Sequence, residues 1–574
     1  MNVLFELTQR YESYFGDPGN GENGFSYQAS LKADRHSEFP QQINDQLNQW
    51  GLAEYYVPQD LGGKLVGYDE LFHLIRLTSR RDLTAAIGHG KTMLGAIAVW
   101  IAGSQPQQQQ LADSILNHDA VALALTEQPH GSDISASDSF CSQTATGYRL
   151  NGSKYLINNA RRAAALTVYA RTAANNNARD FSLFLVKKST LPDSALSYVP
   201  KLLTHGIKGA DISGIRFHNA PLDASALIGQ TGQGLEIMLC GFQLTRTLCT
   251  ALSCGAGDHA LRLAWQYAHQ REVYHAPLAQ LAVIRRRLGN AALDVLIADT
   301  VSLFSSRAIN ILPQQMSIIS AAAKAFVPAS IEAMVDEMVD VLGARAYLES
   351  DGPFSSFSKL QRDCRLVSLF DGSTVINLQA LVVQLPMLAR QRRRQRVDPA
   401  MNAQLGLLFS VDEPLEALQP ARLKLSSKGQ DFIVQSLYEA ARRLSDVEGF
   451  SAETLQKLTR QLGQLRGQLD EIDEFFLQYL PTTRISPRAF AMAHDYTRVF
   501  AAACCLQAFI YSHRLMSPQW RDGLALSACL DRLTATPANL DDRVLDQLQT
   551  TLDKHQLISF FPLPLATSNE RGAR

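Results

Sequence analysis

The sequence predicts a mainly helical protein with a β domain near its middle. The chain has 574 residues, too many for one compact core, so about two to four domains are expected. Apolar residues recur at helical spacing before residue 118 and after Gly232, and they follow β-type patterns in between. We therefore predict a helical domain over 1–118, a β domain over 119–230, a helical bundle over 231–396 and a helical extension over 397–574.

Composition and charge exclude several classes of protein. Hydrophobic residues make up 46% and charged residues 19%, which is typical of a globular protein. A formal net charge of -1 argues against a general nucleic-acid or acidic-membrane binder. The N-terminus lacks a basic, then apolar, leader, and no uninterrupted run of about 18 apolar residues occurs, so neither a signal peptide nor a transmembrane segment is expected. The eight scattered cysteines form no Cys-x-x-Cys pair, so we expect no metal site, no disulfide frame and a cytoplasmic location.

The first domain is expected to be helical from Tyr68, with a buried helix over Leu94–Ala102. Residues 88–92 (GHGKT) look like the end of a phosphate-binding loop. The first glycine of that motif is missing, because Ala85 stands there, and no strand precedes it. We therefore assign no phosphate site to this segment.

The β domain begins where Val121, Leu123 and Leu125 alternate with alanines. A polar loop follows over 126–133, and two strand-like runs flank Asn151-Gly152, which predicts a β-hairpin turn at that dipeptide. Further strands are expected over 166–170, 181–186 and 214–217.

The next region is expected to hold helices over 235–254, 258–270, 280–306, 315–327 and 331–342, with Pro328 separating the last two. Residues 255–260 (GAGDHA) mimic a dinucleotide fingerprint but lie between helices, so that interpretation fails. A last helix is expected to end in the basic run 390–396, most simply a solvated helix end; a docking patch for an acidic partner is the alternative.

The extension is expected to form a second helical bundle, used for packing or oligomer contacts. Helical spacing is visible over 431–444, 452–476, 486–514 and 541–555. The apolar segment 557–564 needs cover, either from the same chain or from a partner.

Asp371 is the candidate for chemistry that the residues themselves suggest. It ends an apolar run and is followed by Gly372, Ser373 and Thr374. A carboxylate at this position could be a base at the mouth of a pocket. Asp-Gly-Ser is also ordinary turn chemistry, and local sequence leaves both interpretations open.

Five motifs, in this order and domain context, resemble those of the acyl-CoA dehydrogenase family over roughly the first two-thirds of the chain. They are 126–133 (TEQPHGSD), 152–160 (GSKYLINNA), Thr245-Arg246, 271–278 (REVYHAPL), and Arg362-Asp363 with 371–373 (DGS). The resemblance implies the family fold: a helical domain, a β-barrel-like domain and a four-helix bundle, here with a C-terminal helical extension.

The resemblance also implies chemistry on an acyl thioester carried by coenzyme A or by an acyl-carrier protein. Family members hold FAD, remove the α-proton with a carboxylate and pass the β-hydride to flavin N5. An electron acceptor such as an electron-transfer flavoprotein or oxygen, and a homodimer or homotetramer, are implied as well. Asp371 falls on the usual base, a glutamate, with its carboxylate set back by one bond, about 1.5 Å. An aspartate there also allows a flavin oxidase of the nitroalkane-oxidase type, or an inactive scaffold.

Residue by residue, the resemblance assigns two groups. The cofactor-binding positions are Leu125, Thr126, Gly131, Ser132, Leu156, Asn158, Ser373 and, toward a neighbouring subunit, Arg271 and Tyr274. The substrate-side positions are Thr245, Arg246 and Phe370. The alternative, purely structural roles are turn hydroxyls for Thr126 and Ser132, a surface ion pair for Arg271 and core packing for Leu156. Ala282 and Asp340 depart from the family pattern, and Asp340 is expected to repel a diphosphate.

Overall fold

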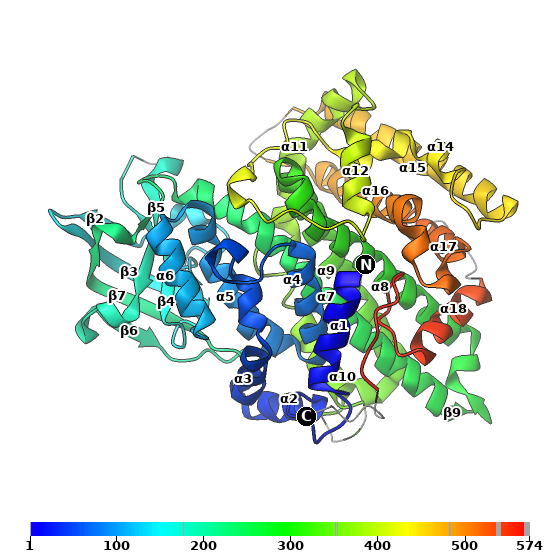
Figure 1. Ribbon diagram of the computed structural model, residues 1–574, viewed down its shortest axis with the longest axis horizontal. Helices are drawn as coiled ribbons and strands as arrows, with labels where there is room; N and C mark the ends of the chain where they lie inside the picture. The colour runs from blue at the N-terminus through cyan, green and yellow to red at the C-terminus, as the bar shows by residue number, and fades with distance from the viewer. Residues whose placement is uncertain are drawn as a thin grey trace.

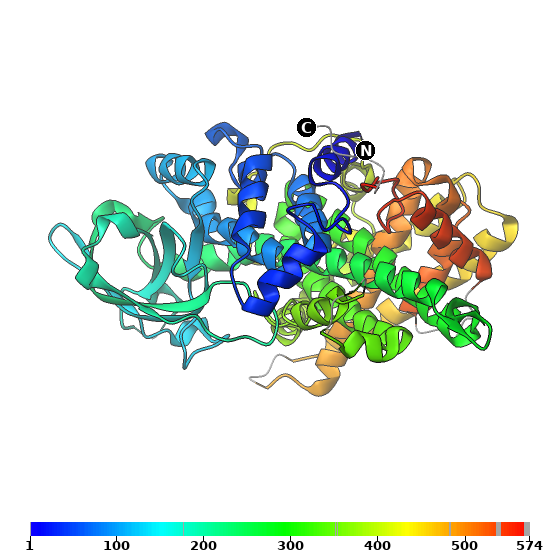
Figure 2. The ribbon, with the colours of Figure 1, turned by 90° about the horizontal axis from the view of Figure 1, so that it is seen from below.

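The computed structural model describes residues 2–175, 177–349, 352, 354–480, 484–534 and 541–567. The β domain lies at one end, a helical body occupies the middle, and the C-terminal helices lie at the other end (Figure 1). The same order is visible in the view turned by 90° (Figure 2).

The N-terminal part is helical. Its helices are α1 (Asn2–Phe15), α2 (Tyr27–His36), α3 (Gln41–Trp50), α4 (Tyr68–Arg81), α5 (Leu83–Ala102) and α6 (Gln105–Leu116). Helix α5 begins earlier than expected, because the Asp82 side chain accepts from the Thr84 amide and caps it. The Gly-His-Gly-Lys-Thr run is therefore part of a mostly buried helix, in agreement with its rejection as a phosphate loop.

The β domain contains one mixed sheet in the order β6-β7-β3-β2-β4-β5-β8, with β1 paired in parallel to β4. The strands are β1 (Val121–Ala124), β2 (Phe140–Gln143), β3 (Gly147–Asn158), β4 (Ala165–Arg171), β5 (Phe181–Lys187), β6 (Leu196–Val199), β7 (Ile212–Asp223) and β8 (Leu227–Ile228).

The hairpin predicted at Asn151-Gly152 is wrong. Strand β3 runs straight through the dipeptide, and its pairing with β7 shifts register between Leu150 and Gly152. Gly152 has φ +137, and a Cβ there would lie 2.3 Å from the Ser139 hydroxyl oxygen. The glycine therefore permits a β-bulge and a close approach of two strands, where a turn was expected.

The second helical region has fewer breaks than expected. It consists of α7 (Gly234–Gln270), α8 (Ala282–Ile311), α9 (Met316–Leu342), α10 (Ser356–Cys364) and α11 (Thr374–Arg394), with a small hairpin β9 (Glu272–Val273) and β10 (Ala276–Pro277). Helix α7 passes through Gly255, where a Cβ would lie 2.4 Å from the Arg76 carbonyl oxygen of α4. Helix α9 passes through Pro328, so tertiary packing overrides the predicted break.

The C-terminal extension packs on α8, α9 and α11, mainly through α16. Its helices are α12 (Met401–Phe409), α13 (Phe432–Gln435), α14 (Ala440–Leu444), α15 (Ala452–Gln478), α16 (Pro487–Ser512), α17 (Leu524–Leu533) and α18 (Asp542–Asp553). The helix expected over 431–444 is thus two short helices, and α17 was not predicted.

The expectation of a solvated basic end on α11 is wrong for Arg392. Its guanidinium is buried, Nη2 lies 2.6 Å from an oxygen of Asp473, and Nη1 lies 2.9 Å from an oxygen of Asp431. These two ion pairs bind α11 to the extension.

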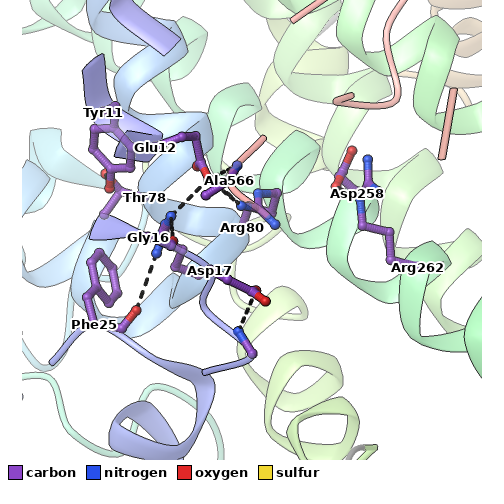
Figure 3. Close-up of polar contacts among 12 residues, drawn as sticks. Tyr11, Glu12, Gly16, Asp17, Phe25, Thr78, Arg80, Asp258, Arg262 and Ala566 are labelled. Carbon is purple, nitrogen blue, oxygen red and sulfur yellow. Dashed lines mark hydrogen bonds and ion pairs between the residues drawn. The ribbon is translucent and has the colours of Figure 1, made fainter. Parts of the chain in front are cut away.

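The apolar segment near the C-terminus is covered by the same chain. Leu557, Ile558, Phe560, Phe561 and Leu563 are all buried. The Ile558 amide donates to Asp258 Oδ2 (2.8 Å), and its carbonyl accepts from Arg76 Nη2 (3.0 Å). Figure 3 shows the end of this tail beside the first helix, where the Ala566 amide donates to Glu12 Oε2 (3.1 Å).

Four helical segments are strongly apolar although polar residues interrupt them. Among the described residues, the segments Leu83–Ala102, Gly234–Gln270, Ala282–Ile311 and Pro313–Tyr347 are long and apolar enough to cross a membrane, by length and composition only. Their most apolar windows are 72% to 94% buried inside the protein. The apolar surface of these helices is therefore largely used for packing within the fold.

Candidate active site

Asp371 lies in the turn between α10 and α11. Its φ is +52, an unusual value for a residue with a side chain, and Gly372 follows with φ +88. Ser373 then caps α11, because its hydroxyl accepts from the Ile376 amide (3.4 Å). Backbone strain of this kind clusters at functional sites.

Lys324, a buried residue of α9, holds this turn in place. Its Nζ donates to the carbonyl oxygens of Val367 (2.7 Å), Phe370 (3.0 Å) and Gly372 (3.1 Å). Burial lowers the pKa of Lys324, although Cys249 and Asp371 oppose that effect. The three donors of the ammonium are thus committed to the backbone of the turn.

Two side chains contact the same oxygen of Asp371. Lys91 Nζ, from α5, lies 2.6 Å from Oδ2 and 4.0 Å from the centre of the Phe370 ring. Cys249 Sγ, from α7, lies 3.5 Å from Oδ2, and burial raises the pKa of this thiol to about 12. Among the described residues, Oδ1 has no hydrogen-bond partner. The sequence analysis did not assign Lys91 to this site. Lys91 precedes Asp371 by 280 residues, and nothing in the local sequence links the two.

A small apolar cavity lies beside Asp371, with a volume of about 30 Å³. Its walls include Ile75, Ile87, Lys91, Leu94, Leu248 and Leu252, from α4, α5 and α7. The cavity as it stands has room for only a few waters. An apolar wall next to a carboxylate is what an acyl chain and a base require.

The structure brings the predicted substrate-side residues together around Asp371. Thr245 lines the cavity, and its buried hydroxyl has no hydrogen-bond partner among the described residues. Arg246 lies close to Gly372, with a buried Nε that also lacks a partner in the described part of the chain. Burial lowers the pKa of Arg246, and Asp371 opposes the shift. Phe370 is half-buried and faces the ammonium of Lys91.

The predicted cofactor residues of the β domain lie in or next to the 126–133 loop and at the end of β3. Gly131 and Ser132 are exposed, and Leu125, Thr126 and Asn158 are half-buried. Leu156 is 54% exposed with φ +56, which contradicts the core-packing alternative. The Asn158 Oδ1 atom is buried and has no partner among the described residues.

Glu127 and Lys154 fix the loop that carries Gly131 and Ser132, and sequence reasoning did not single them out. Glu127 accepts from Lys154 Nζ (2.7 Å), the Asp138 amide (2.7 Å), the Ser139 amide (3.0 Å) and the Ser137 hydroxyl. Burial alone would raise the pKa of Glu127, but Lys154 and these hydrogen bonds lower it to about 2. Glu127 lies within motif 126–133 and Lys154 within motif 152–160, so their place in these motifs could have indicated their importance.

These residues fit a flavin. The ring edge of a flavin carries hydrogen-bond donors and acceptors, and the unpartnered Oδ1 atom of Asn158 needs a donor. A Cβ at Gly131 would have no atom within 4 Å, so the loop leaves open space there. The exposed Leu156 offers an apolar surface for a ring to pack on.

Arg271 and Tyr274 lie apart from this group within one chain. They flank and form the β9–β10 hairpin, which projects at the end of the molecule opposite the sheet in both ribbon views (Figures 1 and 2). Tyr274 is 87% exposed. Asp340, expected to repel a diphosphate, forms an exposed ion pair with Arg287, whose Nη1 lies 2.6 Å from its carboxylate.

Comparison with known proteins places this geometry in a family. The middle domain of acyl-CoA dehydrogenases matches residues 122–220, and their C-terminal domain matches residues 232–385. The chain is 26% identical over 344 residues to a probable acyl-CoA dehydrogenase of Mycobacterium leprae, across 60% of this chain and 87% of that protein.

Solved structures share the fold. Butyryl-CoA dehydrogenase from Megasphaera elsdenii superposes with a TM-score of 0.60 at 19% identity, covering 66% of this chain and 97% of that one. The FAD complex of PigA has the same TM-score and identity, with 67% and 98% covered. The extension beyond residue 385 lies outside both matched domains. Residues 122–220 and 232–385 of the chain thus match the middle and C-terminal domains of the acyl-CoA dehydrogenase family.

Proposed function

We propose that the protein uses FAD to introduce an α,β-double bond into an acyl thioester, with Asp371 as the base. The observation that carries this proposal is the carboxylate of Asp371 at an apolar cavity, with Thr245, Arg246 and Phe370 around it. Leu125, Thr126, Ser132, Leu156, Asn158 and Ser373 would hold the FAD of the same chain. Bound FAD would supply an acceptor for the hydride that leaves the β-carbon.

Each residue has a defined task in this proposal. Oδ1 of Asp371 takes the α-proton, since Lys91 and Cys249 both occupy Oδ2. The apolar wall receives the acyl chain and excludes water, which strengthens the electrostatic interactions within the site. The buried, unpartnered donor of Arg246 helps to stabilise negative charge that develops near the turn.

We also propose a thioester carrier, an electron acceptor and an oligomeric state. The thioester carrier is coenzyme A or an acyl-carrier protein, and the electron acceptor is an electron-transfer flavoprotein or oxygen. The exposed β9–β10 hairpin supports a homo-oligomer in which Arg271 and Tyr274 reach the cofactor of a neighbouring subunit. We propose a cytoplasmic location.

The visible absorption spectrum of the purified protein tests the cofactor, and anaerobic addition of acyl thioesters tests the reaction. We expect a flavin band that bleaches with a thioester. Oxygen consumption with small nitroalkanes, without bleaching by thioesters, would favour the nitroalkane-oxidase alternative. A protein that stays colourless after addition of FAD would refute the redox function and leave an inactive scaffold.

A further inference from the structure

The charges around Asp371 do not balance. Lys91, Lys324 and Arg246 bring three cations to the site, and in the described part of the chain Asp371 is the carboxylate that acts on them. The nearby Cys249 thiol is neutral, because burial raises its pKa to about 12. A buried excess of positive charge is costly unless an anion completes the site.

Lys91 is the cation that is able to change partners. Lys324 is fixed by three backbone carbonyls, whereas the Lys91 ammonium ends a flexible four-carbon stem and contacts Asp371 Oδ2 and the Phe370 ring. Lys91 also forms part of the cavity wall, on the same helix as Ile87 and Leu94.

The cavity is small for an acyl chain, and Lys91 is one of the side chains that enclose it. Its volume of about 30 Å³ has room for only a few waters, so an acyl chain of several carbons must displace a side chain. Moving Lys91 off Asp371 without a new partner would leave two buried charges unpaired. An acyl chain that brings its own anion would pair Lys91 again and free Oδ2 of Asp371, whose charge Arg246 and Lys324 still face.

We infer that the substrate is a short acyl thioester whose acyl chain ends in a carboxylate, and that Lys91 selects it by exchanging Asp371 for that carboxylate. This inference rests on the proposed function, because it assumes that the cavity receives an acyl chain. Lys91 is then a specificity-determining residue, and the base becomes fully available once the correct substrate is bound.

Pantetheine thioesters test the inference, because pantetheine is common to coenzyme A and acyl-carrier proteins. Glutaryl-pantetheine and pentanoyl-pantetheine have acyl chains of equal carbon number and differ in the terminal carboxylate. Their dissociation constants are measured by calorimetry with the purified full-length protein, with Lys91→Met, and with Lys64→Met as control. Lys64 is a surface lysine paired with Glu54, so its loss removes a charge outside the site.

The wild type and Lys64→Met are expected to bind the glutaryl compound at least about tenfold more tightly than the pentanoyl compound. Lys91→Met is expected to lose or reverse this preference while melting as cooperatively as the wild type. Equal binding of the two compounds by the wild type, or a preference that survives in Lys91→Met, would overturn the inference.

Anaerobic bleaching of the flavin band in the same samples separates the two claims. Faster bleaching and tighter binding with the pentanoyl compound would support the redox function and overturn the selection by Lys91. A glutaryl preference in binding, without bleaching by either compound, would support the recognition by Lys91 and refute the redox function.

Discussion

The buried ion pair between Lys154 and Glu127 is expected to stabilise the loop that carries the proposed cofactor residues, and its contribution can be measured. Removing one partner of a buried ion pair costs about 3–5 kcal/mol. In Lys154→Met the Glu127 carboxylate would keep the Ser137 hydroxyl and the Asp138 and Ser139 amides as donors. We therefore expect the loop to lose about 2–3 kcal/mol of stability at pH 7.

The pKa of Glu127 gives a second value for this stabilisation and predicts how it depends on pH. It is lowered from 4.5 to about 2, and each pKa unit corresponds to about 1.4 kcal/mol, so the ionised state stabilises the fold by about 3.5 kcal/mol. Because the folded pKa lies below the unfolded one, this stabilisation is present above about pH 4.5 and is lost as the pH falls toward 2. The difference between Lys154→Met and the wild type should shrink over the same pH range.

Hydrogen exchange measured by mass spectrometry reports this local stability. A loss of 2–3 kcal/mol should speed the exchange of the Asp138 and Ser139 amides about 30- to 150-fold. The control is Lys187→Met, which removes a half-buried lysine from the end of β5 whose Nζ donates to Gln110. Exchange in Lys154→Met within a factor of about three of the wild type would refute the reasoning.

Three further predictions concern the base, the bulge and the tail. Asp371→Asn should slow flavin reduction by a thioester at least about 1,000-fold without changing flavin content, and retention of the wild-type rate would exclude Asp371 as the base. Gly152→Ala should destabilise the protein by about 2 kcal/mol or more in denaturant titrations, because of its φ of +137 and the close strand, whereas Gly131→Ala should change stability by less than about 0.5 kcal/mol; equal effects would contradict the bulge argument. Ala566→Pro removes the amide that donates to Glu12 and should cost about 1–2 kcal/mol, seen as a lower melting temperature; an unchanged melting temperature would show that the tail contact contributes nothing.

Local patterns predicted the helical, β, helical order because they reflect backbone geometry. Side chains repeat every 3.6 residues in a helix and every two in a strand, so the element type near Leu235 or Val121 can be read from neighbours along the chain. The same approach failed at Asn151-Gly152 and at Pro328, where residues distant in sequence override a local preference.

In the candidate site, too, the sequence indicated some residues and not others. The motifs singled out Thr245 and Asp371, which the structure brings together, and the resemblance implied a task for each. The exchange partner Lys91 lies in a helix that local sequence describes only as apolar and buried. No spacing rule links it to Asp371, because the two residues meet only when α5 packs against the turn before α11.

By itself, the sequence determined which segments are helices and strands, which loops carry polar motifs, and which family the chain resembles. The tertiary structure alone decided which charges are paired: Lys91 with Asp371, Lys154 with Glu127, and Arg392 with Asp431 and Asp473. Periodicity constrains neighbours a few residues apart, whereas a buried ion pair depends on how whole helices and strands dock. That docking brings the base, its lysine and the cavity together in one site.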